Sequence, residues 1–146
     1  MTLPTHILLG LVIGKVTGNY ELGIFSSIAP DFDHIASYMK SGVLKNPILF
    51  WKTVTDREDS YGDQRGILHN ILVFIVCSMI LIYFFKFIGL VIMFGWLGHI
   101  ILDMLDNSDY WPFYPNKKID IRGPIKYFSF QEFLFFVCLL IVYSVM

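Results

Sequence analysis

The feature that most constrains this chain is a series of apolar stretches long enough to cross a lipid bilayer. Residues Ile67 to Phe85 contain no formally charged side chain when His69 is neutral, and after Lys86 the charge-free run resumes from Phe87 to Leu102. Because an α-helix rises about 1.5 Å per residue, about 20 apolar residues span the hydrocarbon core. The sequence therefore predicts two membrane-spanning helices, 67–85 and 87–105, joined by a turn at Lys86.

The two ends of the chain extend this pattern. A third span-length apolar stretch runs from Phe128 to Met146, whereas the N-terminal apolar stretches 3–14 and 22–29 are short and are separated by Gly18. Hydrophobic residues make up 55% of the 146 residues and charged residues 16%, a composition typical of membrane proteins. We expect an all-α integral membrane helical bundle with three transmembrane helices and a short N-terminal helical hairpin.

The polar segments set the expected organisation of one membrane-embedded domain. Its parts are the short helical hairpin 1–30, the polar connection 31–66, the transmembrane hairpin 67–105, the polar and aromatic loop 106–127 and the C-terminal transmembrane helix 128–146. The two polar segments carry nine of the eleven Lys and Arg residues, so the positive-inside rule places them on the cytoplasmic side of an inner or plasma membrane. A net charge of −1 argues against nucleic acid as a partner and leaves membrane lipids.

Ionisable residues stand at matching positions in the two transmembrane stretches. Lys86 is seventeen residues from both His69 and Asp103, so an antiparallel pair that turns at Lys86 brings these two side chains to the same depth. His99 lies four residues before Asp103 and therefore on the same helix face. Ionisable residues in apolar helices are costly to bury, which makes this position a candidate functional site.

The N-terminal hairpin repeats this arrangement. His6 and Asp31 lie twelve and thirteen residues from Gly18, and the sequence Pro-Asp-Phe-Asp-His places Asp33 and His34 directly after Asp31. Both hairpins therefore bring His and Asp side chains to one membrane face.

Imidazole and carboxylate groups are the ligands that hold Zn²⁺ or Mn²⁺. A single histidine at an interface is commonly a hydrogen-bonded core or rim residue, but the convergence of all four histidines with nearby carboxylates favours a metal site. We expect it to bind one or two divalent transition-metal ions. The candidate ligands are His6, Asp31, Asp33, His34, His69, His99 and Asp103.

Such a site favours an enzyme that hydrolyses a phosphoester through metal-activated water, and its depth suits a phospholipid or a lipid-linked phosphate. Asp33 is the candidate general base. Arg65 is the candidate phosphate-binding residue, although an arginine that snorkels at the start of a span fits its position equally well. Two further functions fit the pattern, a component of a metal or proton transporter and a metal-stabilised membrane scaffold without catalysis.

Four short segments resemble an inner-membrane-associated family of metal-dependent hydrolases typified by the bacterial YdjM and YbcI proteins. They occur in the family's order over nearly the whole chain, as THILLGLVIG from Thr5, APDFDH from Ala29, RGILHN from Arg65 and GHIILDMLD from Gly98, with WPFYP downstream. The resemblance implies a membrane-associated metal hydrolase and does not specify a substrate.

This chain departs from the family pattern in the third segment. Gln64, Leu68 and Asn70 stand where the pattern has His, Thr and Ser, so one potential ligand is missing. Three outcomes are compatible with this departure: weak binding of a second ion, its binding by another carboxylate such as Asp63 or Asp106, or loss of activity.

Overall fold

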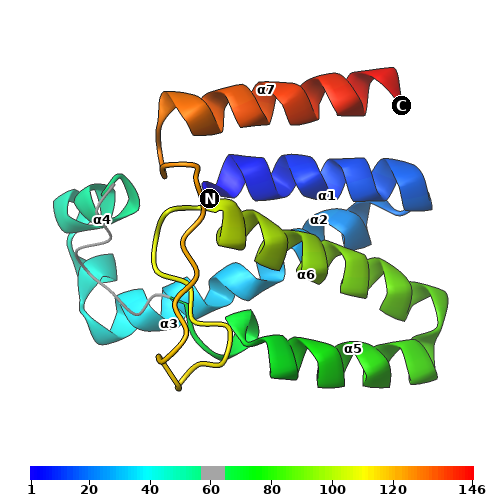
Figure 1. Ribbon diagram of the computed structural model, residues 1–146, viewed down its shortest axis with the longest axis horizontal. Coiled ribbons are helices and arrows are strands. Elements are labelled where there is room, and N and C mark those ends of the chain that lie inside the picture. Colours follow the sequence, from blue (N-terminus) through cyan, green and yellow to red (C-terminus); the bar gives the residue numbers. More distant parts are fainter. Residues whose placement is uncertain (57–64) are drawn as a thin grey trace.

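The computed structural model describes residues 1–56 and 65–146 and is all-helical, with no strand among these residues (Figure 1). Four helices run roughly side by side: α1 (Leu3–Thr17), α5 (Ile71–Phe85), α6 (Phe87–Leu105) and α7 (Phe130–Val145). The helix α2 (Tyr20–Ile28) packs against α1 and α6. The helices α3 (Phe32–Lys40) and α4 (Pro47–Val54) lie at the end of this bundle, together with the loop after α6.

The number of spanning helices differs from the sequence prediction. Only α6, of 19 residues, is both long and apolar enough to cross a membrane among the described residues, so the prediction of three such helices is wrong. Both α5 and α7 are shorter than their apolar stretches, and the 15 residues of α5 rise only about 22 Å. The α5 stretch is shortened because its first residues form the 3-10 turn η3 (Ile67–His69), after which Asn70 caps the helix through its side chain.

The N-terminal hairpin is held together by a close approach of two glycines. The turn between α1 and α2 uses Gly18 with φ of 73°, a left-handed conformation that glycine adopts at low cost. A Cβ atom on Gly23 would lie 2.6 Å from the carbonyl oxygen of Gly10, and one on Gly10 would lie 2.6 Å from Cα of Ile24. The backbones of α1 and α2 therefore touch, which places His6 beside the segment that follows α2.

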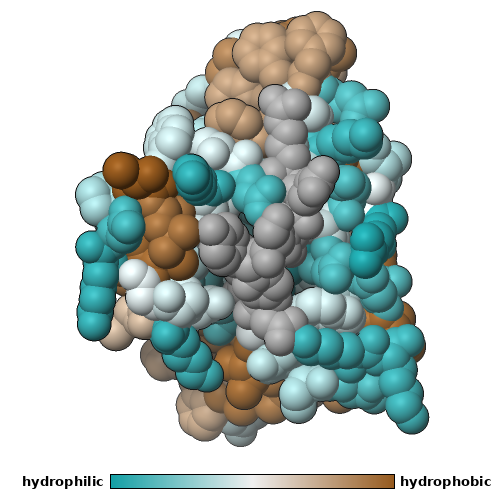
Figure 2. All heavy atoms as spheres, turned by 90° about the vertical axis from the view of Figure 1, so that its left-hand side faces the viewer, coloured by the Kyte–Doolittle hydropathy of each residue, from teal (hydrophilic) through white to brown (hydrophobic). Residues whose placement is uncertain are grey.

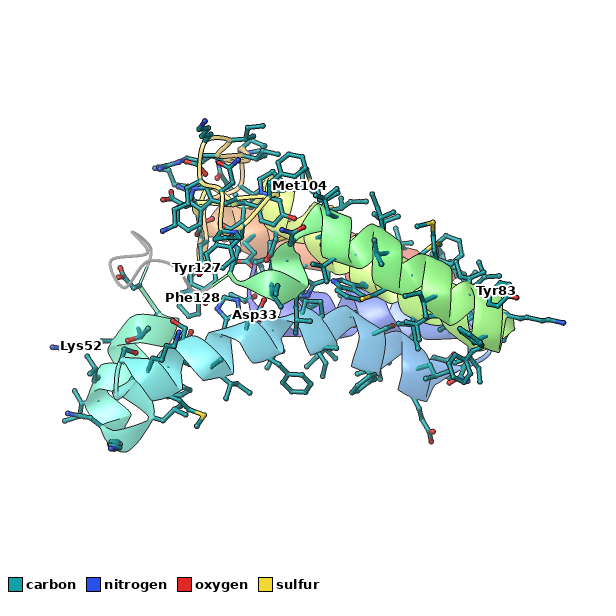
Figure 3. All side chains as sticks on the ribbon, turned by 90° about the horizontal axis from the view of Figure 1, so that it is seen from below. Asp33, Lys52, Tyr83, Met104, Tyr127 and Phe128 are labelled. Atoms are coloured by element: carbon teal, nitrogen blue, oxygen red, sulfur yellow. The ribbon has the colours of Figure 1, made fainter. Side chains whose placement is uncertain are left out.

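The polar connection 31–66 contains more structure than the sequence analysis expected. After the 3-10 turn η1 (Ala29–Asp31), α3 continues almost in line with α2, as Figure 3 shows. A second 3-10 turn, η2 (Val43–Lys45), leads to α4, whose first turn is capped by the Asn46 side chain. This part of the chain forms two surface helices that project past the end of α6.

Substitution of Gly23 tests the close helix contact. We expect Gly23→Ala to lower the free energy of unfolding by about 1–3 kcal/mol, because the added methyl group must displace the α1 backbone. The midpoint of thermal unfolding in detergent or nanodiscs is the measurement. The control is Val16→Ala, because Val16 lies on α1 but is 66% exposed. Equal midpoints for the parent and Gly23→Ala would contradict the close packing.

Candidate metal centre

Side chains from four separate elements meet at the end of α6 where α3 begins. They come from α1 (His6), η1 (Asp31), η3 (His69) and α6 (His99 and Asp103). His6, His69, His99 and Asp103 are each at most 2% exposed. Three overlapping groups have potential ligand atoms within 4.8 Å of one another: His6 with Asp31 and His99, Asp31 with His34 and His69, and His69 with His99 and Asp103.

The outer hydrogen bonds of two histidines fix which nitrogen faces the centre. His99 Nδ1 lies 2.7 Å from the carbonyl oxygen of Ser27, and a carbonyl accepts only from a protonated nitrogen. His69 Nδ1 lies 3.1 Å from a carboxylate oxygen of Asp33, which likewise favours the Nδ1–H tautomer. In both neutral rings the lone pair is then on Nε2, the atom that points inward.

The two Nε2 atoms lie only 3.1 Å apart, and Oδ2 of Asp103 is 3.2 Å from His69 Nε2 and 3.6 Å from His99 Nε2. Two lone pairs and a carboxylate oxygen at these distances repel unless a proton or a cation lies among them. Burial lowers the pKa of His69, but hydrogen bonds to Asp103 and Asp33 outweigh it and raise the pKa above its ordinary value. The centre therefore attracts positive charge.

His6 completes the inner side of the cluster. Its ring stacks on His99 at a centroid distance of 3.9 Å, and Nε2 lies 3.4 Å from Asp103 Oδ1. Among the described residues, Nδ1 of His6 has no hydrogen-bond partner and Nε2 has only this long contact with Asp103, although the side chain is fully buried. A buried imidazole with so little hydrogen bonding is costly, and a metal ion is a partner that its nitrogen can bind. The residues present therefore fit a divalent transition metal.

Asp33 lies on the outer side of His69, and none of the three groups includes it. One of its oxygens accepts hydrogen bonds from the backbone N–H groups of Gly66 and Leu68 as well as from His69. Burial raises the pKa of Asp33, but these hydrogen bonds and the charge of His69 outweigh it and hold the pKa below its ordinary value. Asp33, which is labelled in Figure 3, therefore anchors η3 and orients His69.

Arg65 lies in a buried ion-pair network. Its Nε donates to Asp103 Oδ2 at 2.9 Å, its NH2 lies 3.6 Å from Asp106 Oδ2, and its NH1 donates to the carbonyl oxygen of Asp109. The α-amino group of Met1 also lies within 2.9 Å of both Asp103 and Asp106. Asp103 therefore contacts the histidines on one side and the Arg65 guanidinium and the Met1 amino group on the other.

The sequence analysis did not identify the Met1 amino group as part of this network and treated Asp106 only as an alternative ligand. A carboxylate seven residues after His99 was the available signal for Asp106, because that spacing continues the helix face of Asp103. Gln64 and Asp63 lie outside the described residues, so the structure does not place the position at which the family pattern has a further histidine.

A cavity of about 660 Å³ opens beside the cluster. Asp31, His34, Arg65 and Asp103 line it beside the cluster, and its other polar side chains are Tyr38, Thr53, Asp56, Ser108 and Tyr127. Its walls are mostly apolar and include Leu3, Ile28, Phe32, Ile35, Leu44 and Phe50. The candidate ligands are therefore reached from a space that suits an amphiphilic molecule.

In the part of the chain that the structure describes, the fold and the cluster define an all-helical protein with one helix long and apolar enough to cross a membrane and a buried His/Asp cluster at the end of its bundle. Over residues 1–146, the whole chain, the sequence matches the family described as YdjM inner membrane protein, and the chain belongs to that family. No curated protein and no solved structure gives a match.

Removal of a central ligand tests metal binding. We expect purified protein in nanodiscs to contain Zn²⁺ or Mn²⁺ and His99→Ala to lose it, because His99 belongs to two of the three ligand groups. Elemental analysis gives the metal content. The control is Asp109→Asn, since Asp109 pairs with Arg122 and belongs to none of these groups. Metal-free parent protein after growth in metal-supplemented medium would argue against the centre.

Asp33→Asn tests the orienting role separately. The substitution removes the negative charge that strengthens the hydrogen bond from His69 Nδ1 to Asp33, while the side chain at position 33 keeps its size. We expect metal affinity to fall about 10–100-fold without complete loss of binding. Competition with a chromogenic chelator measures this change. Unchanged affinity would show that the orientation of His69 does not depend on Asp33.

Proposed function

We propose that this chain is a membrane-bound, metal-dependent hydrolase that acts on a phosphoester of a lipid, such as a phospholipid or a lipid-linked phosphate. The observation that carries the proposal is the cavity, which joins a His/Asp cluster to apolar walls in one continuous space. A lipid phosphoester matches this cavity, because its polar headgroup can lie at the cluster while its acyl or isoprenoid chain lies along the apolar walls.

His6, Asp31, His69, His99 and Asp103 would hold the metal, and His34 lines the cavity beside them. Such a set of nitrogen and oxygen donors matches Zn²⁺ or Mn²⁺. When bound, the ion supplies Lewis acidity, which stabilises charge on phosphate oxygens and makes water more acidic.

The other roles follow from which side chains line the cavity. Arg65 lines the cavity while its guanidinium pairs with Asp103. We propose that this guanidinium orients a phosphate group beside the cluster. Asp33 is engaged by three donors, and we assign it to positioning instead of to proton transfer. His34 lines the cavity with Nε2 3.4 Å from Asp31 Oδ1, and we propose that the His34 imidazole accepts a proton from water.

The membrane arrangement is part of the proposal. We infer that the shorter apolar helices α1, α5 and α7 lie beside α6 within the bilayer, where local thinning can accommodate their length. The Lys and Arg residues concentrated in residues 31–66 and 106–127 support a cytoplasmic position for the metal centre. A transporter would instead need polar residues along the depth of the membrane, whereas His99 and Asp103 lie within the last two turns of α6.

A non-catalytic, metal-stabilised scaffold is the second candidate. It is favoured by the engagement of Arg65, which is already neutralised by Asp103 and Asp106. The two functions differ in one result, because a scaffold binds metal tightly without turning over any phosphoester.

Turnover assays in nanodiscs test the proposal. We expect phosphate release or headgroup release from lipid phosphoesters, loss of activity with a chelator and recovery on addition of Zn²⁺ or Mn²⁺. His34→Gln should lower the turnover number by about 10²-fold, as expected for loss of a general base. Its metal content is measured in parallel, so that a lost ligand and a lost base are distinguished.

The control for this assay is again Asp109→Asn, which should retain the parent rate. A short-chain, water-soluble phosphoester should be a poor substrate, because it leaves the apolar walls of the cavity unfilled. Metal-replete protein without turnover of any lipid phosphoester would overturn the hydrolase proposal in favour of the scaffold.

A further inference from the structure

The helices α3 and α4 carry large apolar side chains that the rest of the described structure does not cover. Phe32, Ile35 and Met39 recur at helical spacing along one side of α3, and Met39 is 66% exposed. On α4, Ile48 and Trp51 are one turn apart and are 71% and 66% exposed. An exposed apolar surface of this extent marks an interaction site.

The same segment carries three lysines. Lys40, Lys45 and Lys52 lie between residues 34 and 55, a stretch without Asp or Glu that follows Asp31 and Asp33 and precedes Asp56. All three lysines are exposed. Exposed apolar side chains combined with lysines are typical of helices that lie on anionic lipid surfaces.

The position of α3 and α4 matches the surface of a bilayer that α6 crosses. Figure 3 shows Lys52 at one extreme of the molecule and Tyr83, near the turn between α5 and α6, at the other. The exposed helices thus lie at the end of α6 that carries Asp103. Figure 2, which faces this end, shows a largely hydrophilic surface with hydrophobic patches at its margin.

The apolar surface also continues into the cavity. Phe32, Ile35 and Leu44 are exposed to solvent and at the same time line the cavity wall. A lipid surface is the one occupant that covers the apolar side chains, pairs with the lysines and is continuous with the membrane around α6. A protein partner would have to supply both an apolar surface and acidic residues, and nothing in the described structure indicates one.

We propose that α3 and α4 form an interfacial membrane-binding element in which Lys40, Lys45 and Lys52 contact anionic lipid headgroups while the apolar side chains enter the boundary below them. The mouth of the cavity then opens toward the lipid. This inference concerns how the chain lies on its membrane, and it holds whether or not the metal centre hydrolyses phosphoesters.

The experiment uses the full chain in nanodiscs and the fluorescence of Trp51. Trp96 and Trp111 are present in both the parent and the Trp51→Phe variant. The emission of Trp51 is therefore obtained by subtracting the spectrum of Trp51→Phe from that of the parent. In discs of phosphatidylcholine and phosphatidylglycerol we expect brominated phospholipids to quench this component and aqueous iodide to quench it weakly. In discs of phosphatidylcholine alone, we expect weaker quenching by brominated phospholipids and stronger quenching by iodide.

The charge contribution is tested by replacing Lys40, Lys45 and Lys52 together with Gln. Each lysine near an anionic surface contributes about a fivefold factor, so the equilibrium between bound and released helices should shift by roughly 100-fold toward release. The matched control replaces Lys117, Lys118 and Lys126 with Gln, which removes the same charge from exposed positions of the loop after α6 and should leave Trp51 quenching unchanged.

Three results would overturn the inference. Strong iodide quenching without bromolipid quenching would place Trp51 in water, and protection from both quenchers would show that protein, such as a second copy of the chain, covers α4. Equal effects of the two triple Lys→Gln variants would remove the role of the three lysines on α3 and α4.

Discussion

The burial of one carboxylate, Asp103, organises this structure. A charged carboxylate in an apolar environment costs several kcal/mol unless other charges and hydrogen bonds compensate for it. Here compensation comes from Arg65, from the Met1 amino group and from histidines of three different elements. Because these groups are distant in the sequence, the helices that carry them have to converge on the end of α6. The same convergence assembles the ligands of the candidate centre.

Orientation of the ligands follows from contacts one layer further out. The Ser27 carbonyl and the Asp33 carboxylate hold the Nδ1 atoms of His99 and His69, so the opposite nitrogens face each other. Ser27 is in turn brought close by the tight packing of α2, in which a Cβ atom on Gly10 would lie 2.4 Å from Ser27 Oγ. The glycine contact between α1 and α2 and the geometry of the centre are therefore parts of one arrangement.

Much of this arrangement is contained in the pattern of the sequence. The turn at Lys86 and the equal spacing of His69 and Asp103 around it predicted a shared depth, and the two side chains lie 3.2 Å apart. The length of α5 was not predictable from hydropathy, because Ile67 and Leu68 are apolar yet belong to the 3-10 turn that presents His69. The helices α3 and α4 were missed because their lysines made the segment read as a polar connection. The anchoring position of Asp33 depends on backbone N–H groups of Gly66 and Leu68, which a pattern of side chains does not reveal.

The spread of the ligands along the chain has a consequence for how the protein is made. His6 precedes its neighbours His99 and Asp103 by more than 90 residues. Until α6 has been synthesised, His6 and Asp31 lack the α6 side chains that they contact in the folded chain. The buried cluster can therefore form only after synthesis has passed Asp103, so its assembly is a late step in folding.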